Sequence, residues 1–254
     1  MCGIGHLRKP WAVMLLLLGC GACTAVGTEA PKLREFKTVG IISAVGDTLT
    51  VTKAGLSGPG NGQRVYPIES WGIDDLIVSR ASALLSRRFQ PRPVTYRRTA
   101  FAALERSNPV VVVNLLRKDR IGDLVRTEAS PQGLDAYVVI TKGTSMYGNG
   151  GRSVGGIGIT NHSALLKSYN QIHALYVVTV IDGHKFSVLE KRSAAPLDNT
   201  EIVRLGGPSR MVDDTLLPTA TGAAGSEKLK EAVTDLIERS LPATLEGLRL
   251  FDPS

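Results

Sequence analysis

The strongest apolar run of the chain lies at the N-terminus and has the layout of an export signal. A short basic segment that ends in Arg8-Lys9 precedes an uninterrupted apolar run from Pro10 to Gly19. This order is typical of a secretory signal peptide. The run is shorter than the roughly 20 apolar residues that a helix needs to cross a bilayer. A permanent membrane helix is therefore the weaker interpretation.

The end of this run resembles the lipobox of bacterial lipoproteins. Leu17-Leu18-Gly19-Cys20 places a cysteine after a small residue. The resemblance implies that residues 1–19 are removed, that Cys20 is diacylated on sulfur, and that residues 20–37 tether the lipid to the rest of the chain. Cys23 is a second candidate without the upstream leucine, and an ordinary cleaved signal with incidental cysteines is the alternative. Since no aspartate follows Cys20, the resemblance implies the periplasmic face of the outer membrane, with the inner membrane as the alternative.

The next hydrophobic patterns predict a hairpin and a helix. Two β-rich runs, Thr38–Val45 and Thr48–Thr52, flank Gly46-Asp47 and predict a β-hairpin with a tight turn. The stretch 71–88 places apolar residues at helical spacing and predicts a helix that faces the core.

Further elements are predicted from β-branched runs and proline positions. They are an extended segment over 89–96, a short helix over 99–106, a helix after the first residues of 110–126, a strand over 136–140, and a hairpin of 174–181 with 185–190.

The last part of the chain combines an amphipathic helix with long irregular segments. Residues 226–241 carry apolar and charged side chains on opposite faces, with Ser226 as the N-cap, and Pro242 is expected to interrupt or kink the helix. Residues 143–159 are expected to be a flexible glycine-rich loop, whose glycines allow a sharp hairpin crossing. Residues 194–225 are too long for a simple connector and are expected to be a functional loop or a lid.

Composition and charge are compatible with a globular protein that binds an anionic partner. The chain has 254 residues, of which 43% are hydrophobic and 21% charged, as in an ordinary globular protein. Thirty basic and 23 acidic residues give a net charge of +7, and five arginines are concentrated in one short stretch: Arg87, Arg88, Arg92, Arg97 and Arg98. Because guanidinium groups suit phosphates and carboxylates, we expect an anionic envelope component or an acidic partner protein. The alternative is a solvated strand edge that resists pairing. An exported protein is not expected to bind nucleic acid.

A G-x-S-x-G match at Gly151–Gly155 is the one candidate for catalysis. Ser153 would be the nucleophile, with Asp182 and His184 as partners. The motif requires a helix after the serine, whereas the glycines that follow disfavour one. A serine hydrolase is therefore the alternative hypothesis, and a glycine-rich loop is favoured.

Other polar residues are expected to have structural or solvent-exposed positions. Asp74 and Asp75 are expected to be solvated near a helix N-terminus. His162, His173 and His184 are expected at the surface or at strand ends, with no metal site, because no paired ligand spacing accompanies them. The pair Cys20 and Cys23 lacks the context of a redox or zinc motif, so no cofactor is predicted.

The predicted order is β-α-β-α-β-β-β-α, a mixed α/β (α+β) fold with a single mixed sheet and a long C-terminal helix. With the segments 38–42, 133–140 and 236–245, this order is similar to the periplasmic α/β domain of envelope lipoproteins. That group includes the curli-secretion lipoprotein CsgG, the penicillin-binding-protein activator LpoB and the N-terminal domain of TolB. We therefore expect a single domain over 38–250 that is bound to the membrane by its lipid and acts as a non-catalytic binding or assembly module. A pore subunit resembling CsgG is a weaker alternative.

Overall fold

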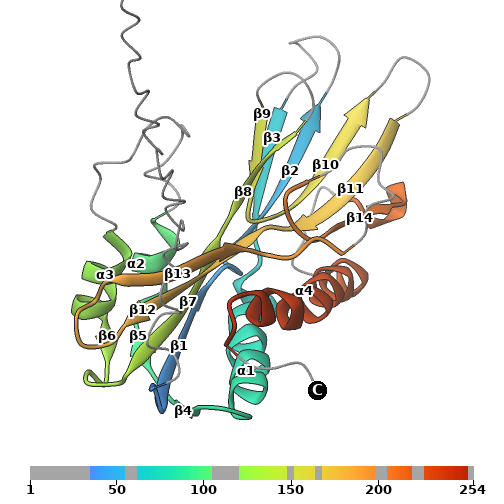
Figure 1. Ribbon diagram of the computed structural model, residues 1–254. Helices are drawn as coiled ribbons and strands as arrows, with labels where there is room; N and C mark the ends of the chain where they lie inside the picture. Colours follow the sequence, from blue (N-terminus) through green and yellow to red (C-terminus); the bar gives the residue numbers. More distant parts are fainter. Residues whose placement is uncertain are drawn as a thin grey trace, which may run out of the picture. The chain divides into compact units, whose positions relative to one another are not determined.

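The computed structural model describes residues 35–54, 62–104, 120–147, 152–163, 168–197, 205–218 and 226–250, all of which belong to the unit Lys32–Ser254. The predicted signal peptide, Cys20, Cys23 and residues 110–119 lie outside the described residues. Strands and helices are labelled in Figure 1. The strands are β1 (Thr38–Ala44), β2 (Thr48–Ala54), β3 (Gly62–Pro67), β4 (Gln90–Arg92), β5 (Thr95–Tyr96), β6 (Ala129–Ser130), β7 (Ala136–Lys142), β8 (Thr144–Tyr147), β9 (Arg152–Gly155), β10 (Ile157–Ser163), β11 (Ser168–Ala174), β12 (Tyr176–Asp182), β13 (Val188–Ser193) and β14 (Ser209–Val212). The helices are α1 (Ile73–Leu85), α2 (Arg98–Ala102), α3 (Arg120–Glu128) and α4 (Glu227–Gly247), with short 3-10 turns at Glu69–Trp71 and Asp214–Leu216.

Most strands form two five-stranded sheets, where the sequence predicts a single mixed sheet. The first sheet has the order β13-β12-β7-β1-β4 and the second β14-β11-β10-β2-β3, while β5-β6 and β8-β9 form two-stranded sheets. Each large sheet is mixed. In the first sheet β1 is parallel to both β4 and β7, and in the second sheet β10 is parallel to β2. The other neighbouring strands are antiparallel. The mixed α/β class and the long C-terminal helix are thus confirmed.

The first sheet is covered by helices on both faces. On β7, Ala136, Val138 and Ile140 join the cluster that includes α1 and α4, whereas Tyr137 and Val139 pack with α2 and α3. This alternation follows from the two-residue period of a strand. A strand covered on both faces has no polar side, which explains the continuous apolar run of β7.

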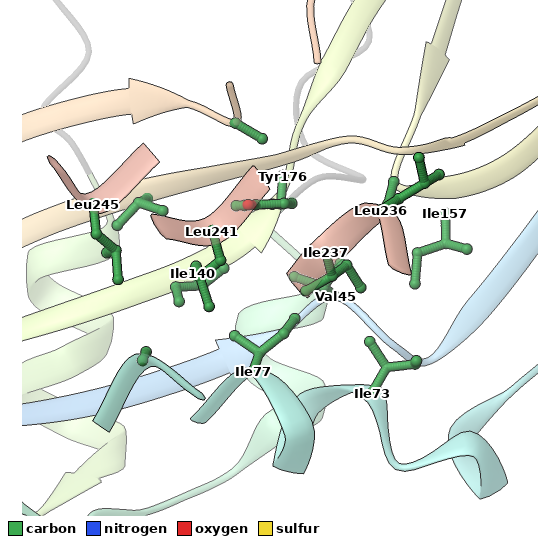
Figure 2. Packing of buried hydrophobic residues seen from close by; sticks show 14 of the residues in the cluster. Val45, Ile73, Ile77, Ile140, Ile157, Tyr176, Leu236, Ile237, Leu241 and Leu245 are labelled. Carbon is green, nitrogen blue, oxygen red and sulfur yellow. The ribbon is translucent and has the colours of Figure 1, made fainter. Parts of the chain in front are cut away.

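The main core lies where α1 and α4 meet the strands. Figure 2 shows Ile73 and Ile77 of α1 in one cluster with Leu236, Ile237 and Leu241 of α4. All five side chains are almost fully buried. Each such burial stabilises the fold by roughly 1.5–3 kcal/mol, so the apolar stripes of the two helices determine where they pack.

Helix α4 begins where it was predicted to begin but does not end at its proline. Ser226 is the N-cap and accepts a hydrogen bond of 3.4 Å from the backbone N–H of Leu229. The helix continues through Pro242, because the buried leucines on both sides keep it against the core. Tyr176 also fixes it, through a hydrogen bond of 2.8 Å with Ser240. Among the described helices, none has the length and apolarity needed to cross a membrane.

The chain crosses from the first sheet to the second between β1 and β2. The hairpin predicted around Gly46-Asp47 is therefore wrong, since β1 pairs with β4 and β7, and β2 pairs with β3 and β10. The reason is a carboxylate from another element. Asp74 accepts hydrogen bonds of 2.7 Å from the N–H of Val45 and from the hydroxyl of Ser43, and of 3.3 Å from the N–H of Gly46. These bonds replace the backbone pairing that a hairpin would need.

Asp74 is buried, which contradicts the prediction that it is solvated. Only 2% of its surface is exposed, whereas the side chain of the adjacent Asp75 is 77% exposed, as predicted. Asp74 lies in the first turn of α1, where the helix dipole favours a negative charge. Its carboxylate thus joins α1 to the crossing between the sheets.

Backbone hydrogen bonds also join the two sheets at the point where the chain passes from β11 to β12. The backbone N–H of Gly143 donates to the carbonyl of Leu175 at 2.9 Å, and the N–H of Leu175 donates to the carbonyl of Gly156 at 2.8 Å. The N–H of Gly156 donates to the carbonyl of Gly143 at 2.9 Å. Leu175 links β11 of the second sheet to β12 of the first. Lys142 adds an ion pair of 2.6 Å with Asp47.

Two segments predicted as loops contain strands. In the first segment, Thr144–Tyr147 pairs with Arg152–Gly155 as β8 and β9, and β10 begins at Ile157. The second segment contains β14, which pairs with β11. The hairpin predicted over 174–190 is confirmed as β12 with β13, and β11 directly precedes it.

The buried carboxylate of Asp74 gives the first testable prediction. Asp74→Ala leaves the hydroxyl and the two N–H groups without their acceptor, so we expect a loss of about 3 kcal/mol in the free energy of unfolding, measured by urea denaturation. Asp74→Asn, which keeps one acceptor oxygen, is expected to lose less. Asp75→Ala is the matched control and should change stability by less than about 1 kcal/mol. Equal losses in Asp74→Ala and Asp75→Ala would contradict the role of Asp74.

Candidate functional site

Two of the five predicted arginines are held by carboxylates. Arg97 precedes α2 and forms an ion pair of 2.5 Å with Glu128. Arg98, the first residue of α2, forms an ion pair of 2.8 Å with Asp75, and its Nε lies 3.6 Å from Asp74. Partial burial works against the charge of Arg98, but the hydrogen bond to Asp75 and the field of Asp74 outweigh it and raise its pKa.

The other three arginines have different surroundings, and Arg87 and Arg92 have no carboxylate partner among the described residues. Arg88 donates to the backbone carbonyl of Arg249 at 2.7 Å and stacks over the ring of Phe89 at 4.9 Å. Arg87 is exposed just after α1. Arg92, at the end of β4, is exposed, and its guanidinium donates to the side-chain oxygen of Gln90 at 3.3 Å. The cluster in the sequence is therefore divided in space.

Arg92 and Arg98 lie on the same open groove, which is the candidate site. The groove has a volume of about 710 Å³, within the usual range of roughly 300–1,000 Å³ for ligand sites. It runs between α1 and the segment from β4 to α2. Its lining residues are Ile41, Asp75, Val78, Ser82, Pro91, Arg92, Pro93, Val94, Thr95, Tyr96 and Arg98.

The groove combines an apolar surface with an excess of positive charge. Five of its eleven lining residues are aliphatic or proline, and its charged groups are two guanidiniums and one carboxylate. The carboxylate, Asp75, is already paired with Arg98. Arg92 therefore remains as the charge that a ligand can neutralise. The wall supplied by α1 was not predicted, although Asp75, Val78 and Ser82 follow the helical spacing that places side chains on one face.

Tyr96 fixes the position of this segment on the first sheet. Its hydroxyl accepts a hydrogen bond from the N–H of Ser43 and donates one to the carbonyl of Ser43, both at 3.0 Å. Burial raises the pKa of Tyr96, although the hydrogen bond from Ser43 opposes the rise. The phenol is thus neutral and structural, and its ring contributes to the groove.

The strand edge beside the groove is closed to backbone pairing. The backbone N–H of Gln90 points toward the β1 side and donates to the carbonyl of Lys37, just before β1, at 2.7 Å. Because successive residues of a strand alternate in direction, Pro91 and Pro93 occupy the outward positions, and proline has no N–H to donate. The part of the segment 89–96 that includes β4 is thus an edge, as predicted, whereas Thr95 and Tyr96 pair with β6. A ligand in the groove must be recognised by side chains.

Ser153 does not lie in a nucleophile elbow. It belongs to β9 and pairs with Met146 of β8, and the chain continues through Gly155 into the strand β10. No helix follows it, so no helix N–H groups are presented beside its hydroxyl, as the G-x-S-x-G mechanism requires. Asp182 meanwhile accepts hydrogen bonds from the backbone N–H groups of His184 and Lys185 in the turn after β12.

Two of the three histidines are buried, and both lie at the end of a strand, one of the two kinds of position predicted for them. His173 lies in β11, is 1% exposed, and its Nδ1 is 3.1 Å from the carbonyl of Gly156. His162 lies in β10, is 8% exposed, and stacks on Tyr169. Only His184 is exposed, as predicted. Within the described ranges, no group of three His, Cys, Asp or Glu side chains is arranged to hold a metal ion.

Comparisons with known proteins give no family for this chain. No protein-family model and no curated protein sequence matches it. Among solved structures, the lipoprotein GNA1162 of Neisseria meningitidis is similar over 82% of this chain and 99% of its own, with 12% identity and a TM-score of 0.26. The protein XCC0632 of Xanthomonas campestris, of the family DUF330, is similar over 84% and 87%, with 8% identity and a TM-score of 0.35. The hypothetical protein CT253 of Chlamydia trachomatis is similar over 84% and 91%, with 12% identity and a TM-score of 0.29. Scores this low carry no argument about the function of the chain.

His173 gives a prediction for the stability of the protein in acid. Burial lowers the pKa of His173 from 6.5 to about 4, and the nearby His162 lowers it further against the hydrogen bond to Gly156. The unfolded chain therefore binds a proton that the folded protein does not, so stability falls as the pH decreases from about 6.5 to about 4, by on the order of 3 kcal/mol. His173→Gln should flatten this part of the curve in urea unfolding measured at several pH values. The exposed His184→Gln is the control. An unchanged slope in His173→Gln would contradict the assignment.

Proposed function

We propose that this protein is a lipid-anchored periplasmic lipoprotein of the outer membrane that acts as a non-catalytic binding or assembly module. Cys20 carries the lipid, and the groove between α1 and β4 binds an anionic group of another envelope component. The observation that carries the proposal is Arg92, an exposed guanidinium on a partly apolar groove, without a carboxylate partner among the described residues.

The composition of the groove supports a carboxylate or phosphate attached to an apolar group. A guanidinium forms its strongest hydrogen bonds with such anions. The aliphatic and proline side chains beside Arg92 offer contact to an apolar part of the same ligand. A small inorganic anion would leave that surface exposed to water. An acidic segment of an envelope protein, with an apolar residue next to its carboxylate, matches both features.

The arrangement of charges supports recognition of one anionic group rather than a general attraction. Arg97 and Arg98 are neutralised by Glu128 and Asp75. Without residues 1–19, which include Arg8 and Lys9 and no acid, the net charge falls from +7 to 28 − 23 = +5. The basic character of the groove therefore depends mainly on Arg92.

A non-catalytic role agrees with the position of Ser153. The serine lies in a strand without a following helix. Among the described residues, the groove contains no histidine or cysteine that could act as a base or nucleophile.

Arg92→Glu tests the groove as the binding site. A photoreactive amino acid at Ser82, on the α1 wall, should crosslink the partner in intact cells. We expect Arg92→Glu to reduce this crosslink about tenfold or more, because a lost charge-assisted hydrogen bond costs roughly 1.5–3 kcal/mol.

Arg87→Glu is the matched control, since it makes the same change of charge at an exposed arginine outside the groove. It should leave the crosslink unchanged. Because Arg92 is exposed, its substitution should not alter the midpoint of thermal unfolding. A loss of equal size in the two variants would argue for general electrostatic attraction and against the groove.

The lipid anchor is tested by metabolic labelling with a palmitate analogue. The wild-type protein should be labelled, and Cys20→Ser should lose the label because it lacks the acylated sulfur. Cys23→Ser is the control and should keep it. Label that persists in Cys20→Ser and disappears in Cys23→Ser would transfer the anchor to Cys23, and label in neither wild type nor variants would overturn the anchor.

A further inference from the structure

The outer edges of the two sheets differ in how they are protected from pairing. On the first sheet, Pro91 of β4 and Pro93 just after it occupy outward positions, and β13 carries Glu190, Lys191 and Arg192 beside a shift of its register with β12. Prolines, charges and bulges are the usual means by which an edge strand avoids pairing with another chain. On the second sheet, β14 is short, with four residues, whereas β3 has six.

The register of β3 shows which of its backbone groups point outward. Pro67 is opposite Thr48 of β2, and the next residue, Ile68, donates its N–H to Asp47 at 3.0 Å. Ile68 therefore faces β2, and the alternation of an antiparallel pair directs the N–H and C=O groups of Gln63 and Val65 away from it. Pro67 shares their direction, which explains why a proline is tolerated there.

The outer side of β3 is open. No other strand of the described residues pairs with it, and its residues are exposed except for Tyr66, which is half-buried. Val65 is 59% exposed, the highest value among the exposed large hydrophobic residues of the described chain. The edge combines unpaired backbone groups, an exposed β-branched side chain and no acidic residue. It has the properties of a strand that pairs with a further strand.

We propose that β3 pairs antiparallel with β3 of a second copy of this chain, about a two-fold axis at Val65. The two second sheets then form one continuous sheet across the dimer. In this register Val65 is opposite Val65 of the second copy, Arg64 is opposite Tyr66, and Gln63 is opposite Pro67. The N–H of Val65 donates to the carbonyl of Val65, and the N–H of Gln63 to the carbonyl of Pro67, in both directions.

The sequence of β3 selects this register over its neighbours. Outward groups must meet outward groups, so only registers that pair odd-numbered residues with each other are allowed. The register centred on Arg64 has the same overlap but places the two Arg64 side chains directly opposite, where like charges are destabilising. The register centred on Val65 instead places each Arg64 beside the ring of Tyr66, which attracts a cation, and covers both exposed valines. The strand is therefore self-complementary.

The expected dimer is reversible, because one pair of short strands is a small interface. Cysteine substitution captures such a dimer. Residues opposite each other in a hydrogen-bonded pair have Cα atoms about 5.5 Å apart, within the range of roughly 4.4–6.8 Å that a disulfide spans. Two residues away from the axis, the equivalent positions are too far apart for a disulfide.

The experiment compares three single-cysteine variants of the full chain, with Cys2, Cys20 and Cys23 replaced by serine. Val65→Cys, Arg64→Cys and Gln63→Cys are each purified in mild detergent and treated with a mild oxidant. We expect Val65→Cys to form a disulfide-linked dimer on a non-reducing gel and Gln63→Cys not to form one. Because this background lacks Cys20, the result does not depend on the lipid anchor.

A second variant tests the backbone pairing itself. Gln63→Pro in the Val65→Cys background removes an N–H that points away from β2, so β3 stays in its sheet while the contact between copies loses a hydrogen bond on each side. We expect at least about fivefold less disulfide. A dimer formed by Arg64→Cys in place of Val65→Cys would overturn the register. Equal dimer from all three variants, or from none, would overturn the pairing of β3 with a second copy.

Discussion

The carboxylate of Asp74 is the constraint on which the rest of the structure depends. It accepts the N–H groups of Val45 and Gly46 and the hydroxyl of Ser43 at the point where the chain leaves the first sheet for the second. Buried backbone N–H groups need an acceptor, and without this carboxylate the crossing would leave those of Val45 and Gly46 without one. Because Asp74 lies in the first turn of α1, the same group fixes the helix that forms one wall of the groove. Its proximity to Arg98 extends this network to the other wall.

Regular patterns were predictable from the sequence, and contacts between distant residues were not. The amphipathic stripe of α4, the helical spacing of α1 and the hairpin of β12 with β13 are each determined by residues within one segment, and each was predicted. The β1-β2 crossing was mistaken for a hairpin because its turn residues are typical of both, and the deciding acceptor lies 28 residues farther along the chain at Asp74. Adjacent aspartates with opposite burial also cannot be distinguished by composition.

The candidate site was also predictable only as far as it depends on residues of one segment. The arginine cluster was identified from its density in the sequence, but density does not reveal which guanidiniums are neutralised. Glu128 and Asp75 come from other elements and remove Arg97 and Arg98 as free charges. Arg92 remains because Pro91 and Pro93 place it on an edge that no neighbouring strand can cover. The prolines that were read as signs of an extended segment thus also determine which arginine is available to a ligand.

The groove and the outer side of β3 both lie at sheet edges, and the two edges differ in how they are protected from backbone pairing. The same edge that prolines close to backbone pairing carries the groove, so binding there depends on side chains and on one charge. The edge of β3 has neither prolines at its central outward positions nor like charges on neighbouring residues, and its recognition depends on backbone groups and on Val65. The two edges belong to different sheets. Self-association through β3 would therefore leave Arg92 exposed, and each copy in a dimer would present its own groove to a partner.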